Sequence, residues 1–379
     1  MAEQLTMVSL EEQPLGNSFE KVFIGNAGSA GGAGLDVSEV FGTYVEATGA
    51  GTTTVDQGID LSGEGGLWWG KIRNISGDPD GRLELHDTER GAGNYLRSDS
   101  SAAETANSFN FLSSFTSTGY TGWNGVNGYD VVSWTFRKAP KFFDVVTFTG
   151  NGVLGRTISH NLGSVPGMII LKRTNDAASW YCYHRGVDSS APEDFVLLLD
   201  GTNARINSSA AWNDTAPTAA VFTVGDNSNF NGDGDTYVAY LFAHNNGDGE
   251  FGPDSDQDII KCGSWTETGS DVVVDLGSGA AWTFMAIRRG PLAPPEAATE
   301  VFAVQAQAGG YQVNRFASSG FPVDFVLDKE YDDPSNWVAY DRLRGGKADL
   351  KTNLTSAEST NSPAPIGFDY NDGITEGFY

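Results

Sequence analysis

The chain has 379 residues, of which 48 are glycine and 12% are aromatic, a composition that predicts several hydrophobic cores built from short strands and tight turns. Its formal net charge of −26 opposes binding to nucleic acid and to anionic membranes. The 2 cysteines are too few for a disulfide framework, and both lie in apolar or aromatic runs that predict buried free thiols.

The first residues of the chain, 1–18, are polar and contain only scattered apolar side chains. They lack the apolar stretch of a signal peptide, and no segment of the chain approaches the ~18 apolar residues of a membrane-spanning helix. A polar segment of this kind becomes ordered mainly through contact with another chain. We therefore expect residues 1–18 to be a docking segment and the protein not to insert into a membrane.

A succession of similar segments recurs three times along the rest of the chain, which indicates tandem modules. Each module opens with a short strand, continues with an apolar strand that has a basic end, and then reaches a strand that closes on Arg-Gly. We place the modules at 19–140, 141–256 and 257–379. The opening strands are expected at 22–26, 146–151 and 259–264, the basic-ended strands at 67–73, 168–173 and 284–289, and the Arg-Gly pairs at Arg90, Arg185 and Arg344.

The third module differs from the first two in its expected strands. The first two finish with an aromatic strand, at 131–136 and 237–242, whereas counting from Arg344 places the third such strand beyond the last residue. We therefore expect the third module to be incomplete, with the missing strand supplied by a continuation of the natural chain or by a neighbouring subunit. An insertion at about 290–325, which begins with the proline-rich 291–295, is expected to contact a neighbour.

Short strands of ~4–8 residues separated by regular turn signals predict an all-β fold of tandem antiparallel β-sandwich or jelly-roll modules with few helices. Five further segments stand at 66–71, 87–96, 134–144, 158–168 and 236–244. They resemble the repeats of tail-fibre-like virion structural proteins of marine bacteriophages. That resemblance covers most of residues 20–270 and implies concanavalin-A-like sandwiches, a location in the virion after assembly in the host cytoplasm, host attachment, and host glycan as a ligand.

The strongest indication of enzyme chemistry is the run Glu-Leu-His-Asp-Thr-Glu at 84–89. Glycosidases on similar sandwiches use two carboxyl groups, ~5–5.5 Å apart in retaining enzymes. Strand alternation places Asp87 and Glu89 on one face, but Leu85 occupies the position where the nucleophile of that pattern would stand. Because the histidines also lack metal-ligand spacing and no serine lies in a nucleophile elbow, we expect no enzymatic activity.

Two sets of residues are candidates for a binding site. Asn231, Asp233 and Asp235 offer side-chain oxygens at alternate positions, which suits either calcium or a tight turn. The recurring Arg-Gly suits either an arginine that pairs with a carboxylate at a sheet edge or one that grips an acidic sugar or a neighbouring subunit. These arginines are Arg90, Arg185 and Arg344.

These patterns together predict a structural protein of a phage virion, part of a tail fibre or similar appendage, that provides rigid spacing and contacts host glycan. The alternative is a capsid decoration or head-fibre protein with the same modules and a different anchor, and the enzyme alternative is a polysaccharide depolymerase. We expect the protein to be a homo-oligomer and to contact other virion proteins through residues 1–18.

Overall fold

The computed structural model describes residues 34–46, 52–74, 83–106, 112–123, 130–266, 281–288, 315–318, 322–360, 366–368 and 373–376. By its contacts the chain divides into residues 1–31 and 32–379, and every described residue belongs to the second unit. The docking segment expected at 1–18, the opening strand expected at 22–26 and most of the insertion expected at about 290–325 lie outside the described residues.

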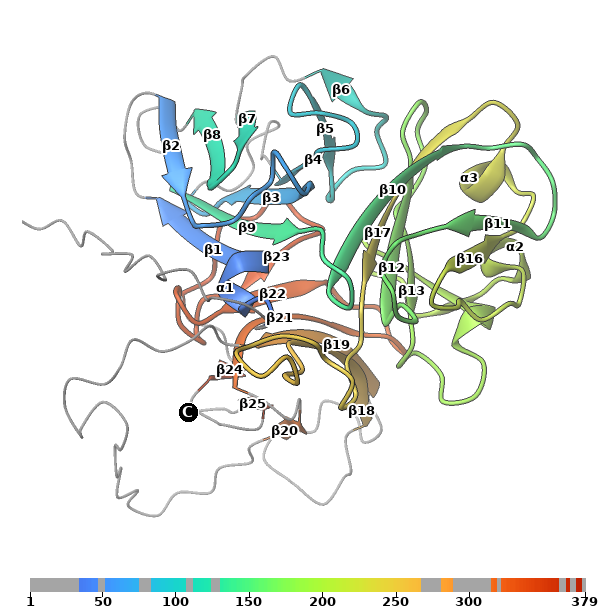
Figure 1. Cartoon of the computed structure of the whole chain (residues 1–379). Helices are drawn as coiled ribbons and strands as arrows, with labels where there is room; N and C mark the ends of the chain where they lie inside the picture. Colours follow the sequence, from blue (N-terminus) through green and yellow to red (C-terminus); the bar gives the residue numbers. More distant parts are fainter. Residues whose placement is uncertain are drawn as a thin grey trace, which may run out of the picture. The chain divides into compact units, whose positions relative to one another are not determined.

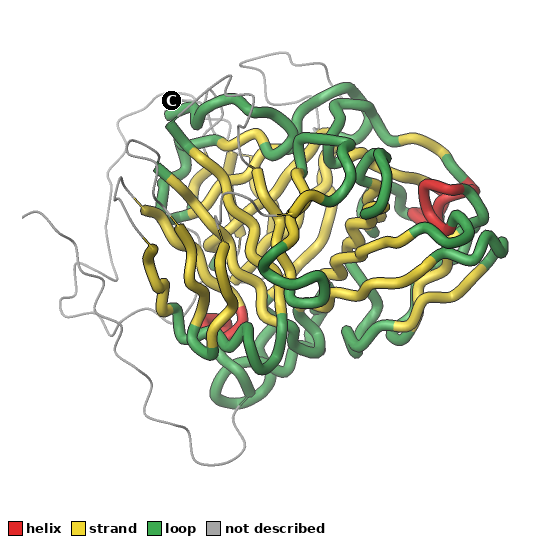
Figure 2. Tube along the Cα trace, turned by 90° about the horizontal axis from the view of Figure 1, so that it is seen from above, coloured by secondary structure: helices red, strands yellow, loops and turns green. Residues whose placement is uncertain are grey.

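The chain is mostly β, with 45% strand and 6% helix in several antiparallel sheets, which confirms the predicted fold class (Figure 1). Figure 2 shows the helices as brief interruptions among the strands. None of the described helices is long and apolar enough to cross a membrane. The helices are α1 (Val37–Val40), the 3₁₀ helix η1 (Pro192–Asp194), α2 (Ser209–Trp212) and α3 (Ser228–Asn231).

Three large sheets organise the described part of the chain. In spatial strand order, the first is β1 (Phe41–Glu46), β9 (Val131–Arg137), β3 (Gly66–Ile72), β4 (Leu83–Asp87), β5 (Asn94–Arg97) and β6 (Thr105–Ala106). The second is β10 (Phe143–Thr149), β17 (Thr236–Phe242), β12 (Met168–Arg173), β13 (Tyr181–His184), β14 (Phe195–Leu198) and β15 (Ile206–Asn207). The third is β18 (Ile260–Thr266), β19 (Ala281–Arg288), β21 (Val323–Glu330), β22 (Val338–Asp341) and β23 (Leu350–Lys351).

A smaller sheet accompanies each large one in the chain. In the first module its strands are β2 (Thr52–Asp56), β8 (Gly119–Trp123) and β7 (Leu112–Thr116). In the second they are β11 (Arg156–Ser159) and β16 (Val221–Val224). In the third they are β20 (Arg315–Ser318), β25 (Gly373–Glu376) and β24 (Ile366–Gly367).

Strand pairing makes the three large sheets equivalent strand by strand. One row of directly opposed residues crosses four strands in each sheet and ends on the strand before the predicted Arg-Gly. The row is Phe41, Phe136, Leu67 and Asp87 in the first sheet, Phe143, Phe242, Met168 and His184 in the second, and Ile260, Ile287, Phe325 and Asp341 in the third. The predicted repeat is therefore present, and β19 stands in the third sheet where β9 and β17 stand in the others.

This equivalence corrects one expected strand. The basic-ended strand of the third module is β21 rather than 284–289, because Lys329 of β21 is in register with Lys71 and Lys172. In the first sheet β1 holds the place of β10 and β18 in the other two, and the strand expected at 22–26 stays a prediction outside the described residues. The error at 284–289 arose because an apolar run with a polar end is typical of every inner strand and does not specify which one it is.

The expected gap in the third sheet is also a wrong prediction, since β19 fills that position. The equivalent strands differ in their order along the chain. β9 and β17 follow the other strands of their modules, whereas β19 directly follows β18 and precedes the rest of its module. The end of the expected insertion contributes β20 and the start of β21. The module boundaries at 19–140, 141–256 and 257–379 remain predictions.

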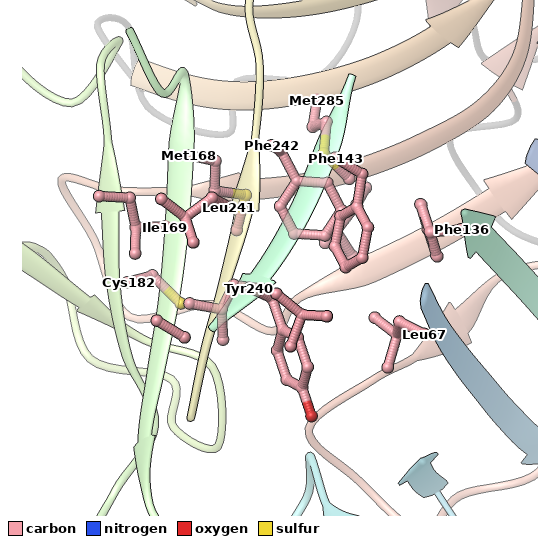
Figure 3. Close-up of a cluster of buried hydrophobic side chains, with 14 of the residues drawn as sticks. Leu67, Phe136, Phe143, Met168, Ile169, Cys182, Tyr240, Leu241, Phe242 and Met285 are labelled. Carbon is pink, nitrogen blue, oxygen red and sulfur yellow. The ribbon is translucent and has the colours of Figure 1, made fainter. Parts of the chain in front are cut away.

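One hydrophobic core is shared by all three large sheets. Figure 3 shows Phe136 of the first sheet, Phe242 of the second and Met285 of the third in a single cluster. The ring centroids of Phe136 and Phe242 lie 5.4 Å apart in an edge-to-face arrangement, which is a favourable geometry for an aromatic pair. Each large sheet therefore buries one face in a core that it shares with the other two.

Inner strands are buried on both faces, which explains why their sequences are apolar runs rather than alternating patterns. All residues of β3 are buried. Trp69 belongs to the shared core, whereas the adjacent Trp68 belongs to a second cluster with Val55, Leu112 and Tyr120 of the small sheet. The first module is thus a sandwich whose outer layer is the small sheet.

Three lysines at equivalent places are buried at these inner strands: Lys71, Lys172 and Lys329. The ammonium of Lys71 donates to the carbonyl oxygens of Lys351 at 2.9 Å and Leu354 at 2.8 Å, both in the third module. In the same way, Lys172 of the second module donates to the carbonyl of Ser101 in the first at 3.0 Å. Carbonyl oxygens thus compensate part of the cost of burying these charges.

Burial lowers the pKa of Lys172 from 10.5 to about 8, so between these pH values the unfolded chain binds more protons than the folded chain. The free energy of unfolding therefore rises with pH across this window. We expect the difference in unfolding free energy between the wild type and Lys172→Met to grow in favour of the wild type, by at most about 1.4 kcal/mol per pH unit.

Chemical denaturation of both proteins at several pH values measures this difference. Lys261→Met, which removes a partly exposed lysine, is the control and should follow the wild type. A difference for Lys172→Met that stays constant or shrinks as the pH rises would contradict the prediction.

Candidate functional site

A buried aspartate–arginine pair lies at the end of the shared row in the first and third sheets. In the first, the Arg90 Nε lies 2.6 Å from Asp87 Oδ2 and the Arg90 backbone N–H donates to Asp87 Oδ1 at 2.9 Å. In the third, Arg344 makes the same two contacts with Asp341, at 2.5 and 2.9 Å. Both arginines act within a tight turn, so the pair is set by the local sequence Asp-x-x-Arg-Gly.

The glycine of this motif is required by the turn that holds the pair. Gly91 and Gly345 have φ angles of 83° and 85°, a left-handed conformation that glycine adopts without steric cost. The Gly91 N–H donates to the Asp87 carbonyl at 2.9 Å, and the Gly345 N–H to the Asp341 carbonyl at 3.1 Å. The recurring Arg-Gly therefore marks a turn that orients its arginine back toward the aspartate.

Each aspartate also accepts a hydrogen bond from a different module. The Tyr240 hydroxyl of the second sheet donates to Asp87 Oδ2 at 2.8 Å. The Trp134 indole N–H of the first sheet donates to Asp341 Oδ2 at 3.3 Å, and the Arg344 guanidinium lies 5.8 Å from the centre of the Trp134 ring. Tyr240 and Trp134 occupy equivalent positions on β17 and β9. The two hydrogen bonds to the aspartates are therefore equivalent as well.

A glutamate completes each cluster. The Arg90 Nη1 lies 2.9 Å from Glu104 Oε2, and the Glu104 backbone N–H donates to the carbonyl of Thr174 in the second module at 2.7 Å. The third module repeats this arrangement against the first. There Arg344 Nη1 lies 3.2 Å from Glu358 Oε2, and the Glu358 backbone N–H donates to the Arg73 carbonyl at 2.7 Å.

Arg73 adds a second ion pair to the cluster of the third module. Its guanidinium meets both carboxylate oxygens of Glu358 at 2.8 Å, which is the strong two-point geometry of arginine and carboxylate. Burial alone would raise the pKa of Glu358, but the hydrogen bonds and charges of Arg73 and Arg344 outweigh it and lower the pKa. The seam between the third and first modules is therefore held by charges that stay ionised.

The second module has a neutral residue, His184, at the place of the two aspartates. Its Nδ1 accepts from the Gly186 N–H at 3.1 Å, so the proton lies on Nε2, which donates to the Phe284 carbonyl of β19 at 3.1 Å. Burial lowers the pKa of His184 to about 3, which keeps the ring neutral. Three contacts thus join the modules in a cycle. Tyr240 joins the second module to the first, Trp134 joins the first to the third, and His184 joins the second to the third.

The arginines predicted as a binding site fall into two kinds. Arg90 and Arg344 are equivalent, but their side chains are 5% and 0% exposed and are held in buried ion pairs. Arg185 directly follows His184 and is exposed, while Val187 takes the place of Arg90. The predicted equivalence of all three arginines is therefore wrong. The aspartate three residues before the arginine, present at 87 and 341 and absent from the second module, is the signal that separates them.

The loop predicted to hold either calcium or a turn has nitrogen donors as its partners. The Asn231 side-chain oxygen accepts from the Asn151 N–H and from Arg156, both at 3.1 Å. The Asp235 carboxylate lies 2.8 Å from Arg173. Asp233 is exposed, next to Gly234 with a φ of 79°. These contacts favour the tight turn, and calcium binding stays a prediction that they do not support.

The carboxylates at 84–89 are also engaged with basic groups. Asp87 pairs with Arg90, Glu89 lies 2.8 Å from Lys138, and Glu84 lies 3.0 Å from His86. Within the described ranges, no group of three or more His, Cys, Asp and Glu residues could hold a metal ion. The arrangement suits the packing of strands rather than acid–base chemistry.

Both cysteines are buried free thiols, as predicted. Burial raises the pKa of Cys262 to about 12, so the thiol stays protonated and unreactive in the core.

A family model described as a domain of unknown function, DUF7483, matches residues 36–263. The chain belongs to the DUF7483 family. No curated protein and no solved structure matches it. The DUF7483 match includes the first two large sheets and ends within β18, so the Arg90 cluster and His184 lie inside it and the Arg344 cluster lies outside.

Removing Arg344 should be much more damaging than removing Arg185. Arg344→Met leaves Asp341 without its buried cation, and we expect a loss of about 3–5 kcal/mol of unfolding free energy. Arg185→Met removes an exposed side chain and should change it by about 0.5 kcal/mol or less. Urea denaturation of the three proteins gives both values.

The double variant Asp341→Asn with Arg344→Met should recover part of the loss, because it removes the uncompensated negative charge. Equal, small effects of Arg344→Met and Arg185→Met would show that the buried ion pair does not stabilise the fold.

Proposed function

We propose that this protein is a structural component of a phage virion, part of a tail fibre or similar appendage, where it acts as a rigid spacer. The observation that carries the proposal is the cycle of buried contacts between the modules. A spacer needs modules that keep their mutual orientation, and here the contacts of Tyr240, Trp134 and His184 tie each module to another. The sequence resemblance to tail-fibre-like repeats supplies the virion location.

The cost of moving the modules apart supports this role. Separation would expose the shared core and leave Asp87, Asp341 and Glu358 without some of their partners. Unpaired buried charges cost several kcal/mol each, and exposed apolar surface adds to that cost. Interfaces between mobile domains are usually smaller and more polar than a common hydrophobic core.

A spacer is also consistent with the pairing of the carboxylates at 84–89 with basic side chains. The carboxylates that a depolymerase would need are held by Arg90 and Lys138, which favours the spacer over the enzyme. Only exposed groups could contact a host glycan. Among the three predicted arginines, Arg185 is the exposed one. A guanidinium in such a position is suited to the carboxylate of an acidic sugar.

The location can be tested on purified particles of the phage that encodes this chain. Mass spectrometry should find the protein in particles after gradient purification, and gold-labelled antibodies against it should bind the tail. A replication enzyme of the same phage serves as the control and should be absent from the particles.

Label on the head would instead support the capsid decoration or head-fibre alternative. A protein that is abundant in the infected cell but missing from the particles would overturn the proposed function.

A further inference from the structure

Two histidines of the second module lie against β18 and β19 of the third. His184 Nε2 donates to the carbonyl of Phe284 on β19 at 3.1 Å. His244 Nδ1 accepts the backbone N–H of Cys262 on β18, also at 3.1 Å. The histidine seam, as we call this contact, is formed by His184, Gly186 and His244 of the second module and by Cys262, Gly263 and Phe284 of the third.

Both rings fit this seam only in their neutral form. His184 Nδ1 accepts the backbone N–H of Gly186 at 3.1 Å, just as His244 Nδ1 accepts that of Cys262. A protonated ring nitrogen carries a hydrogen and cannot accept another one. An imidazolium at either place would therefore set two donors against each other, so the uptake of a proton requires a hydrogen bond at the seam to break.

His86 of the first module has the opposite surroundings. Its Nδ1 lies 3.2 Å from the carbonyl oxygen of Ala92, and its Nε2 lies 3.0 Å from Glu84 Oε2. Both partners are oxygen acceptors, so a doubly protonated ring can donate to each of them. Protonation of His86 thus keeps both hydrogen bonds, whereas protonation of either seam histidine breaks one.

The closed seam also disfavours the charged rings electrostatically. Burial and the charge of Arg185 lower the pKa of His184 from 6.5 to about 3, and His244 acts in the same direction. Burial, Arg185 and Lys261 lower the pKa of His244 from 6.5 to about 4, while Asp248 acts in the opposite sense. In an open seam both rings would be solvated and would titrate near their ordinary pKa. Between about pH 4 and 6.5 the open form therefore binds more protons than the closed form, and acid favours it.

We propose that β18 and β19 part from the second module at the histidine seam in mild acid, while the seam between the third and first modules stays closed. Each histidine that becomes exposed raises the ratio of open to closed molecules by roughly 50- to 100-fold between pH 7.5 and 4.5. This inference goes beyond the proposed function and holds whether or not the protein lies in a virion.

The other contacts of the third module do not share this sensitivity. Glu358 is bound by Arg73 through both carboxylate oxygens, and the hydrogen bonds and charges of Arg73 and Arg344 outweigh burial and lower the pKa of Glu358. That pair stays ionised where the histidines take up protons. The hydrogen bond from Trp337 to the Leu198 carbonyl joins the third module to the second without a titrating group. The opening is therefore limited to the histidine seam.

Amide hydrogen exchange tests the proposal, because the N–H groups of Gly186 and Cys262 are themselves the donors to the two rings. Exchange of the wild-type protein is measured by mass spectrometry at pH 7.5 and 4.5 and corrected for the intrinsic effect of pH. We expect the peptides that contain these two N–H groups to lose protection by roughly 50-fold or more at pH 4.5. Peptides from β3 and β9 of the first module should remain protected.

Two matched variants separate the seam from the rest of the second module. His244→Asn keeps an oxygen that accepts the Cys262 N–H but does not titrate, so it should remove most of the acid effect at Cys262. His160 also accepts a backbone N–H at Nδ1, from Leu162 at 3.3 Å, but its Nε2 faces the Thr218 carbonyl of its own module. His160→Asn is therefore the control and should leave the acid effect unchanged.

The wild-type measurement decides the matter even where a variant fails to fold. Seam peptides that stay protected at pH 4.5 would overturn the proposal, and so would peptides of β3 and β9 that lose protection together with them, since that result means unfolding of the whole chain. An acid effect that His160→Asn reduces as much as His244→Asn does would overturn it as well.

Discussion

The fold depends on the buried carboxylate at the end of a strand row. Asp87 and Asp341 each accept hydrogen bonds from an arginine of their own turn and from an aromatic side chain of another module. An ionised carboxylate in a core is costly unless all its partners are present. The carboxylate therefore makes the correct placement of a neighbouring module a condition for folding its own, and this constraint turns three similar sandwiches into one body.

The second module shows that a neutral group can take the same place. His184 makes its contact with a backbone carbonyl, which requires no particular side chain from the third module. The charged clusters instead depend on Tyr240 and Trp134, which no sequence motif links to them. The cycle therefore joins two seams in which an aromatic side chain contacts a carboxylate and one in which the His184 ring contacts a backbone carbonyl.

Much of the fold was predictable from local sequence, because strand runs and turn glycines reflect short-range physics. The closing strands at 131–136 and 237–242 were placed correctly for this reason. The strand order of the third module was not predictable, since β19 and β21 are both apolar runs and only their long-range pairing distinguishes them. The arginine clusters were found as a recurring Arg-Gly, but their burial depends on partners such as Glu104 and Tyr240 from distant parts of the chain.

The placement of Lys71 and Trp134 has a consequence for biosynthesis. Their partners lie at Lys351, Leu354 and Asp341, so the first module cannot satisfy its buried polar groups until almost the whole chain has left the ribosome. Contacts this far apart in sequence form slowly. Until they form, the surface of the first module that the third module will cover stays exposed and is prone to aggregation. Chains cut short in translation would keep that surface exposed, which makes them recognisable to chaperones and proteases before they enter an assembly.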